Sequence, residues 1–435
     1  MCGRKAEEMS RGEMDEGKDY LGYSEALHRI LACTFLMSAE EVGLEGCLGR
    51  ILAVDVKASV DSPGVDVSLK DGYALRSLDV AEACTAHPVR LRLTAPTFAG
   101  SSRAGAVEPG TAAKVFSGAP IPSGADAVVA EEFCQEESNQ VVVRISAEPG
   151  RNILPRGEDI RAGALLFRKG QRLLPGHIGL LAAAGWDRLS VFVRPKVAIV
   201  SIGDEVVAPG RPLAPGQLYA SNMVTLGAWL RNFDIPSFVQ VVRDDTAAIR
   251  QALLHFYASA DTILTSGGAW GSERDFIVRL LDGLGWNKVF HRVRIGPGKG
   301  IAFGLWEGKP VFCLPGGPPS NEIAFLQLAL PGILRMAGYS GPPFATISAR
   351  LIVDLEARSA DWTQFVHARL SMDLKDGLQV TPHRPKSRLE SIAAATCLIT
   401  IPEGEVRLEA GQMIPVQLIA PLSQAMGNTC FASCE

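Results

Sequence analysis

Four short segments of the chain combine glycine, serine and carboxylate side chains in a pattern that suits the binding of an anion. They are Ser201-Ile202-Gly203-Asp204-Glu205, Arg243-Asp244-Asp245, Ser266-Gly267-Gly268 with Ser272-Glu273-Arg274-Asp275, and Pro315-Gly316-Gly317-Pro318-Pro319-Ser320. Paired glycines permit positive φ and a close approach of the backbone to a ligand. Where such a pair precedes a helix, free N–H groups and the helix dipole favour a phosphate or an oxyanion. The chemistry expected here is therefore the binding and transfer of an anionic group.

Carboxylates in the same segments also suit a divalent cation. Glu205, Asp244 and Asp275 are the candidate metal ligands, because Mg²⁺ prefers oxygen donors, keeps several waters and bridges to substrate phosphate. Two of them have a structural alternative. Asp244 could cap a helix that starts near residue 245, and Asp275, like Glu273, could complement the dipole of a first helical turn. Glu205 has no evident structural task in its Gly-Asp-Glu turn.

A loop with two cations, Arg294-Ile295-Gly296-Pro297-Gly298-Lys299, adds positive charge. Lys299 is a candidate ligand for an anion, and a plain surface lysine is the alternative. The loop is not a Walker A loop, because the Gly-Lys-Ser/Thr spacing is missing. No Gly-x-Gly-x-x-Gly motif follows a strand, which disfavours a dinucleotide-binding fold.

The elements that must position these segments alternate between strand and helix. Strands are expected over 196–201, 237–242, 261–266 and 310–314, and helices over 222–231, 245–257, 273–284 and 318–330. This alternation predicts crossover connections and a mostly parallel sheet in a central α/β domain at 190–338. Ligands of such sheets bind beyond the carboxyl ends of the strands. The predicted substrate-binding residues are therefore Ser201, Gly203, Asp204, Ser266, Gly267, Gly268, Lys299, Pro315, Gly316 and Ser320.

The flanking parts of the chain are rich in short β-type runs, so the fold class expected is multidomain α/β plus β. Strands over 89–93, 113–116, 127–130 and 141–145, separated by Gly- and Pro-rich turns, predict an inserted β-rich module at 63–149. Apolar Leu27, Ile30 and Leu31 at helical spacing, and a helix over 175–184, belong to an N-terminal region at 19–62 and 150–189. Strands over 346–353, 365–370, 378–381, 398–401 and 413–419 predict a small barrel-like domain at 345–421. Residues 1–18 and 422–435 are expected to be loose tails.

Composition excludes several classes of partner. The formal net charge of −4 over 435 residues gives no electrostatic case for nucleic acid. No apolar run is long enough to suggest a membrane span, and the first eighteen residues lack the apolar core of a signal peptide. The nine cysteines are scattered without a Cys-x-x-Cys pair, which fits a reduced, cytoplasmic compartment. Metal binding by Cys430 and Cys434 in the tail is a minor alternative.

Taken in order, the motifs resemble those of the molybdopterin molybdenumtransferase family, which includes the bacterial MoeA proteins and the E domain of gephyrin. Residues 66–74 look like the family's Asp-Asn-Ser-Ala-Met-Asp-Gly-Tyr-Ala, and 117–129 are similar to its Thr-Gly-Ala-x-(Leu/Ile)-Pro-x-Gly-Ala-Asp-Ala-Val-Val. The further matches are Arg156-Gly157-Glu158-Asp159-Ile160, Gly203-Asp204-Glu205, Ser221-Asn222, Ser266-Gly267-Gly268 with Asp275, Pro297-Gly298-Lys299 and Leu314-Pro315-Gly316. Each match alone is weak, but eight in order over about residues 20–420 are specific.

The resemblance implies both a fold and a reaction. The fold would have an N-terminal region split around a β module, the central domain and a C-terminal β domain. The active unit would be a homodimer in which the N-terminal region of one protomer reaches the central domain of the other. The reaction would take adenylyl-molybdopterin and molybdate, use Mg²⁺, and release molybdenum cofactor and AMP. This is metal-assisted cleavage of a phosphoanhydride, coupled to oxyanion transfer onto a dithiolene. The catalytic residues implied are Asp66, Asp71, Glu158, Asp159, Glu205 and Asp275.

Several positions depart from the family pattern. Val67 replaces Asn, Lys70 replaces Met, Ala220 replaces Asp, Gly296 replaces Lys, Gly300 replaces Pro, Gly317 replaces Asn, and Trp270 and Ser272 interrupt a usual Ser-Val-Gly. The lost Lys and Asn would normally face the anionic ligand. A catalytically weakened molybdopterin-binding scaffold or carrier therefore stays open, as does a tungstate-specific paralogue, because molybdate and tungstate are tetrahedral dianions of nearly equal size.

Beyond the pterin nucleotide and the oxyanion, other cofactor-assembly proteins are open as partners. A reading in which only the central domain is informative, as in nicotinamide-nucleotide or competence-associated hydrolases, is disfavoured. The reason is that the motifs at 66–74 and 117–129 lie outside that domain.

Overall fold

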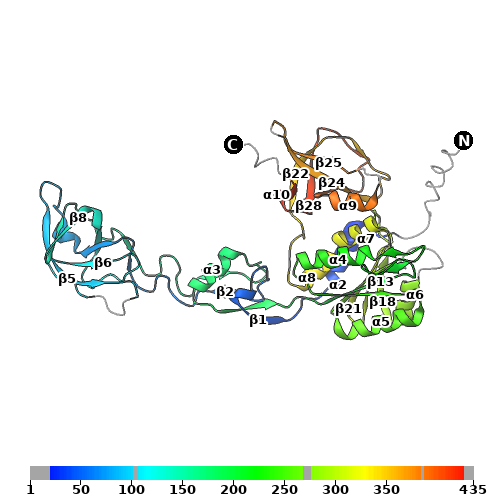
Figure 1. Cartoon of the computed structure of the whole chain (residues 1–435), viewed down its shortest axis with the longest axis horizontal. Helices are drawn as coiled ribbons and strands as arrows, with labels where there is room; N and C mark the ends of the chain where they lie inside the picture. The colour runs from blue at the N-terminus through cyan, green and yellow to red at the C-terminus, as the bar shows by residue number, and fades with distance from the viewer. Residues whose placement is uncertain (1–19, 101–104, 268–275, 374, 384–386, 426–435) are drawn as a thin grey trace. The chain divides into compact units, whose positions relative to one another are not determined.

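The computed structural model describes residues 20–100, 105–267, 276–373, 375–383 and 387–425 (Figure 1). The chain divides into two compact units. One combines the residues up to Ser38 with those from Phe192 onward, and the other spans Ala39–Val191. No helix in the described ranges is both long and apolar enough to cross a membrane. The finer division into six segments stays a prediction.

A six-stranded, mostly parallel sheet forms the centre of the first unit, as predicted. Its order is β16 (Ser237–Val242), β13 (Val197–Ile202), β17 (Thr262–Ser266), β21 (Lys309–Leu314), β20 (Ala302–Trp306) and β18 (Trp286–His291). The first four strands are parallel, β20 runs antiparallel to β21, and β18 in turn runs antiparallel to β20. β20 and β18 are absent from the sequence prediction, because no helix separates them and the strand–helix alternation therefore does not reveal them.

Helices cover both faces of this sheet (Figure 1). Alternate residues of β13 point to opposite faces, so Ile199 packs in one core and Val200 in the other. The first core includes residues of α2 (Tyr23–Cys33), α4 (Ser221–Asn232), α7 (Pro318–Ala324) and α8 (Leu330–Met336). The second core includes residues of α5 (Thr246–Ser259) and α6 (Phe276–Gly283). The N-terminal helix α2 thus belongs to the core of the central sheet.

The helix expected over 318–330 continues beyond Pro331. Proline has no N–H group and its ring clashes with the carbonyl four residues earlier, so a regular α-helix cannot run through it. Here the chain widens into a π-helical turn at Phe325–Ala329 before α8 begins at Leu330. The predicted start of the helix at 273–284 lies outside the described residues, and α6 is described from Phe276.

The C-terminal strands close into a five-stranded barrel, which confirms the barrel-like fold expected there. The order is β24 (Thr363–Asp373), β25 (Gly377–Pro382), β22 (Thr346–Leu351), β28 (Met413–Leu418) and β26 (Cys397–Ile401), and β26 pairs back onto β24. A short helix, α9 (Arg388–Ala394), packs against both β24 and α7. α9 is absent from the sequence prediction.

The second unit contains a six-stranded sheet in the order β7 (Ala127–Ala130), β4 (Gly72–Leu75), β6 (Thr111–Val115), β5 (Val89–Thr97), β9 (Gln140–Val143) and β8 (Cys134–Glu137). The sequence predicted four of these strands and missed β4 and β8. The remainder of the unit includes α3 (Pro175–Ala183), as predicted, and the short pairs β1 (Ala39–Gly43) with β12 (Arg188–Phe192), β2 (Val56–Lys57) with β11 (Leu165–Phe167), and β3 (Val67–Ser68) with β10 (Ile153–Leu154).

Candidate active site

The strand order of the central sheet reverses between β13 and β17. From β13 the chain passes through α4 to β16 on one side, and then through α5 to β17 and β21 on the other. Ser201 near the end of β13 is in register with Ser266 at the end of β17. In open α/β sheets, ligands bind in the crevice outside the carboxyl ends of the strands at such a reversal.

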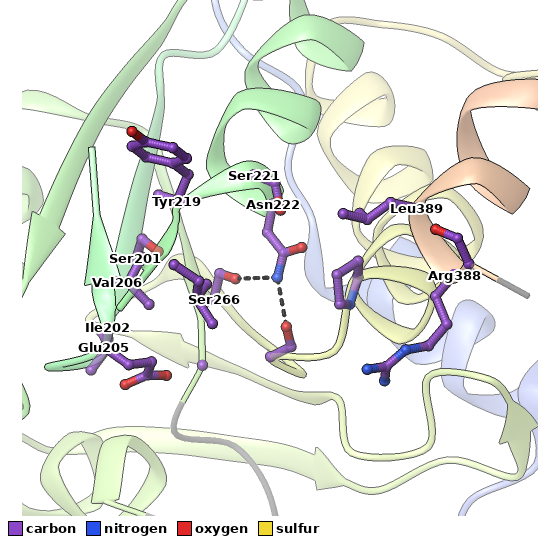
Figure 2. Close-up of a pocket in the computed structure, with 16 residues that line it drawn as sticks. Ser201, Ile202, Glu205, Val206, Tyr219, Ser221, Asn222, Ser266, Arg388 and Leu389 are labelled. Carbon is purple, nitrogen blue, oxygen red and sulfur yellow. Dashed lines mark hydrogen bonds between the residues drawn. The ribbon is translucent and has the colours of Figure 1, made fainter. Parts of the chain in front are cut away.

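A cavity of about 800 Å³ lies at this reversal (Figure 2). Its volume is in the range of about 300–1,000 Å³ that is usual for small-molecule sites. The predicted residues Ser201, Glu205, Ser266, Gly267 and Gly316 all line it. The structure therefore brings together residues that follow three different strands of the sheet.

Ser266 is the centre of a hydrogen-bond network at the floor of the cavity. Its side chain is 3 % exposed, and its Oγ accepts hydrogen bonds from Asn222 Nδ2 at 3.2 Å and Asn321 Nδ2 at 3.0 Å. The same two amides also donate to the carbonyls of Gly316 at 2.7 Å and Pro315 at 2.8 Å. Because both lone pairs of the Ser266 hydroxyl are occupied, its proton remains for donation to a ligand.

Gly267 allows the loops after β13 and β17 to approach each other closely. Its φ is +101°, and a Cβ at this position would lie 2.5 Å from the carbonyl oxygen of Ile202. Only glycine combines this conformation with this contact. Gly268 and Asp275, which follow it, are predicted site residues that lie outside the described residues.

The carboxylates after β13 and β16 have different environments. Glu205 is exposed at the cavity, and its carboxylate accepts no hydrogen bond from any described residue. Asp204 accepts a hydrogen bond from the backbone N–H of Asp244 at 3.3 Å, and Asp245 caps α5 by accepting from the N–H of Ala248 at 2.8 Å. The helix cap is therefore Asp245 and not Asp244, while Asp204 holds the loop after β16.

The donor set at the cavity fits a magnesium ion. Within the described ranges, no group of three or more His, Cys, Asp or Glu side chains is close enough to hold a metal. Mg²⁺, however, commonly uses one or two carboxylates and completes its shell with waters and substrate phosphates. Glu205 supplies such a carboxylate beside the hydroxyls of Ser201 and Ser266. Asp244 does not line this cavity.

The positive charge at the cavity comes from the barrel and not from the predicted lysine. Arg388 and Leu389 of α9 lie on the side opposite Ser201 and Tyr219 (Figure 2). Arg388 is exposed, and its guanidinium makes no hydrogen bond with the described part of the chain. Lys299 does not line the cavity, and its Nζ lies 5.8 Å from the ring centroid of Trp362.

Some predicted site residues at this edge do not line the cavity, and some residues that line it were not predicted. Gly203, Asp204 and Pro315 are chain neighbours of lining residues, and Ser320 follows the lining residue Pro318 by two positions, but none of the four lines the cavity itself. Asn222 occurs in a matched motif yet was not assigned to the site. Arg388 was missed altogether, although Ser387-Arg388-Leu389-Glu390 has the spacing of a helix-capping sequence. Ser387 does cap α9, since its Oγ accepts from the N–H of Glu390 at 3.2 Å.

The remaining predicted carboxylates belong to the second unit. Asp71 Oδ1 accepts from the N–H of Ser117 at 2.7 Å, and hydrogen bonds from the backbone and side chain of Ser117 hold the pKa of Asp71 below its ordinary value. Asp66 Oδ1 accepts from the N–H of Arg156 at 2.8 Å. These contacts join the motifs at 66–74, 117–122 and 156–160. The side chains of Glu158 and Asp159 are exposed. A catalytic role for these four carboxylates stays a prediction.

Departures from the family pattern can also be placed. Gly296 lies on the short strand β19 (Ile295–Gly296), which pairs with Thr363 and Gln364 of the barrel. Gly317 precedes the first residue of α7, and no side chain caps this helix. Lys70 is exposed in the second unit. Neither Gly296 nor Gly317 lines the cavity, whereas Gly316 beside Gly317 does.

Comparison with known proteins assigns the chain to a family. Its residues 21–185, 198–335 and 354–419 match models of the MoeA N-terminal region (domain I and II), a probable molybdopterin binding domain and the MoeA C-terminal region (domain IV). Molybdopterin molybdenumtransferase 2 of Mycobacterium tuberculosis is 32% identical over 382 residues, which cover 86% of this chain and 94% of that protein. The molybdopterin molybdenumtransferase of a Nostoc species is 30% identical, with 87% and 88% covered. The crystal structure of a molybdopterin biosynthesis MoeA protein from Pyrococcus horikoshii superposes with a TM-score of 0.80 at 31% identity, covering 92% of this chain and 99% of that one. The chain therefore belongs to the molybdopterin molybdenumtransferase family.

Proposed function

We propose that this chain inserts molybdate into adenylyl-molybdopterin with release of AMP, in a Mg²⁺-dependent reaction in the cytoplasm. Family membership places it among the transferases of molybdenum cofactor biosynthesis. The observation that carries the finer proposal is the cavity at the strand reversal, where the carboxylate of Glu205, the hydroxyls of Ser201 and Ser266 and the guanidinium of Arg388 are found together.

The residues of the cavity are suited to an anionic substrate. Ser266 can donate its proton to a phosphate or molybdate oxygen, because its lone pairs are taken by Asn222 and Asn321. α4 begins at the cavity with Ser221, and no side chain caps it, so its first N–H groups and its dipole favour negative charge there. Arg388 compensates further negative charge, and arginine is the side chain best suited to phosphate and similar oxyanions.

Glu205 is the residue that would hold Mg²⁺. The bound ion supplies neutralisation of negative charge on the phosphate oxygens. The protein places Glu205 at the mouth of the cavity without a competing hydrogen bond from the described residues. In the proposed active homodimer, Asp66, Asp71, Glu158 and Asp159 are contributed by the N-terminal region of the partner protomer.

The decisive experiment incubates the purified protein with adenylyl-molybdopterin, Mg²⁺ and either molybdate or tungstate, and follows AMP. Oxyanion-dependent release of AMP supports the proposal, and the faster oxyanion identifies the preferred metal. Tight binding of the pterin nucleotide without AMP supports the scaffold or carrier instead. If the protein neither binds the pterin nucleotide nor releases AMP, both functions are refuted.

Matched variants locate the reaction in this cavity. Arg388→Ala removes a charged hydrogen-bond donor, so the KM for the pterin nucleotide should rise about tenfold or more. The control is Arg369→Ala, an arginine on β24 that is also exposed but does not line the cavity. Glu205→Gln should raise the Mg²⁺ concentration needed for half-maximal rate, whereas Glu390→Gln on α9 should not. Equal effects of a site variant and its control would remove that residue from the site.

A further inference from the structure

A buried glutamate joins elements that form both sides of the cavity, yet it takes no part in the reaction proposed above. Glu322 on α7 is 3 % exposed. Its Oε1 accepts a hydrogen bond from Trp229 Nε1 on α4 at 2.9 Å, and its Oε2 lies 2.9 Å from Nε2 of His367 on β24 of the barrel. His367 is 6 % exposed. A buried carboxylate is strongly unfavourable without such partners, so the three side chains hold one another in a defined geometry.

Two of these elements also form the floor of the cavity. α4 carries Trp229 and begins at Ser221 and Asn222, which line the cavity. α7 carries Glu322 and begins at Pro318, which also lines it. The network thus lies on the same two helices that present the amide side chains to Ser266.

The third element leads to the opposite side of the cavity. The carbonyl oxygen of His367 accepts a hydrogen bond from the backbone N–H of His383 at 2.8 Å. Ser387, which caps α9, follows His383 by four residues. α9 itself packs against both β24 and α7. Arg388 and Leu389 are the first two residues of α9. The side chain of His367 therefore contacts the central domain, and its carbonyl oxygen accepts a hydrogen bond from His383, five residues before Arg388.

Other contacts attach the barrel to the central domain independently of this network. Gln327 Nε2 in the π-helical turn donates to Gln417 Oε1 of β28 at 2.8 Å. The strand β19 pairs in parallel with β24 at Thr363 and Gln364. The barrel should therefore stay docked when the network is removed, and the loss should appear in the placement of α9.

We infer that Trp229, Glu322 and His367 are positioning residues that set the place of Arg388 and Leu389 over the cavity, and thereby the affinity for the anionic group of the pterin nucleotide. The inference rests on the proposed function for the identity of that ligand. The positioning itself is a property of the protein without ligand and can be measured alone.

The test uses a triple variant, Trp229→Phe, Glu322→Leu and His367→Leu, in the full-length protein. Replacing a complete buried polar set by apolar side chains of similar size is often neutral for stability, whereas removing one member leaves a buried group unpaired. His367→Gln is the conservative variant, because its amide can still donate to Glu322. It should behave like the wild-type protein in both measurements below.

The first measurement needs no ligand. Hydrogen exchange of the backbone amides of α9 should be about tenfold faster or more in the triple variant, while the amides of β13 and β17 keep their wild-type rates. Unchanged exchange in α9 would overturn the inference. Equal acceleration in the central strands would also overturn it, since the network would then be a general support of the fold.

The second measurement follows AMP release. The triple variant should raise the KM for adenylyl-molybdopterin about tenfold with kcat within about twofold, as Arg388→Ala should. Adding Arg388→Ala to the triple variant should then raise KM by no more than about twofold, because the two changes remove the same contact. Fully additive effects would overturn the inference. If the wild-type protein releases no AMP, the proposed function fails, and the exchange measurement still decides whether the network positions α9.

Discussion

Replacing Ser266 by alanine should destabilise the end of β17 as well as impair the site. The hydroxyl oxygen of Ser266 accepts hydrogen bonds from Asn222 and Asn321. Asn321 is 1 % exposed, and its second amide hydrogen already bonds to Pro315. Ser266→Ala therefore leaves one buried donor without an acceptor. Asn222 is only half-buried and can turn its freed hydrogen to water.

The magnitude follows from the one orphaned donor. A buried donor left unsatisfied costs about 1–3 kcal/mol. A free-energy change of about 1–3 kcal/mol corresponds to a change of roughly 5- to 150-fold in an equilibrium constant. The opening equilibrium of β17 should shift by that factor. The affinity for the anionic substrate should fall in addition, because the alanine can donate no proton to it.

Hydrogen exchange of the β17 amides measures the first effect, and the KM for adenylyl-molybdopterin measures the second. The matched control is Thr265→Val on the same strand. Thr265 is fully buried, and its Oγ1 has no hydrogen-bond partner among the described residues, so this isosteric change should be neutral or stabilising. Equal destabilisation by the two variants, or none by Ser266→Ala, would refute the reasoning.

Three further predictions concern other parts of the chain. Gly267→Ala should abolish binding of the pterin nucleotide, because its Cβ would meet a carbonyl oxygen at 2.5 Å, whereas Gly210→Ala has a φ of +89° but no neighbour within 4 Å and should retain it in a calorimetric titration. The lowered pKa of Asp71 means that its charged form stabilises the fold above its ordinary pKa of 3.8, and that this stability is lost as pH falls below that value. The thermal midpoint of the wild-type protein should therefore fall more steeply than that of Asp71→Asn between about pH 4 and about pH 2.5, the range in which carboxylates usually titrate. Parallel curves would contradict this. Burial raises the pKa of the Cys397 thiol to about 12, so alkylation at pH 7 should label exposed Cys84 well before Cys397, as mass spectrometry can establish.

The architecture, and the edge of the sheet where the site lies, could be predicted from the residue patterns along the chain. Alternating strand and helix patterns require crossover connections, and these make neighbouring strands parallel. Their carboxyl ends then meet at one edge, so the residues that follow them, Ser201, Ser266 and Gly316, had to lie close together. Apolar runs between turns likewise predicted the C-terminal barrel. These conclusions depend on local periodicity and chain direction, which a sequence displays directly.

The side chains that meet at that edge could not be identified without the packing of the whole fold. Asn222 and Asn321 converge on one serine from two different helices, and Arg388 arrives from a barrel more than a hundred residues away in the chain. Lys299 looked equally suitable in the sequence, but it lies beside an aromatic ring of the barrel. The burial of Glu322 is equally invisible in the sequence. Such contacts join residues that are distant in the chain, and their geometry is set by how helices, sheet and barrel pack, for which local residue patterns carry no information.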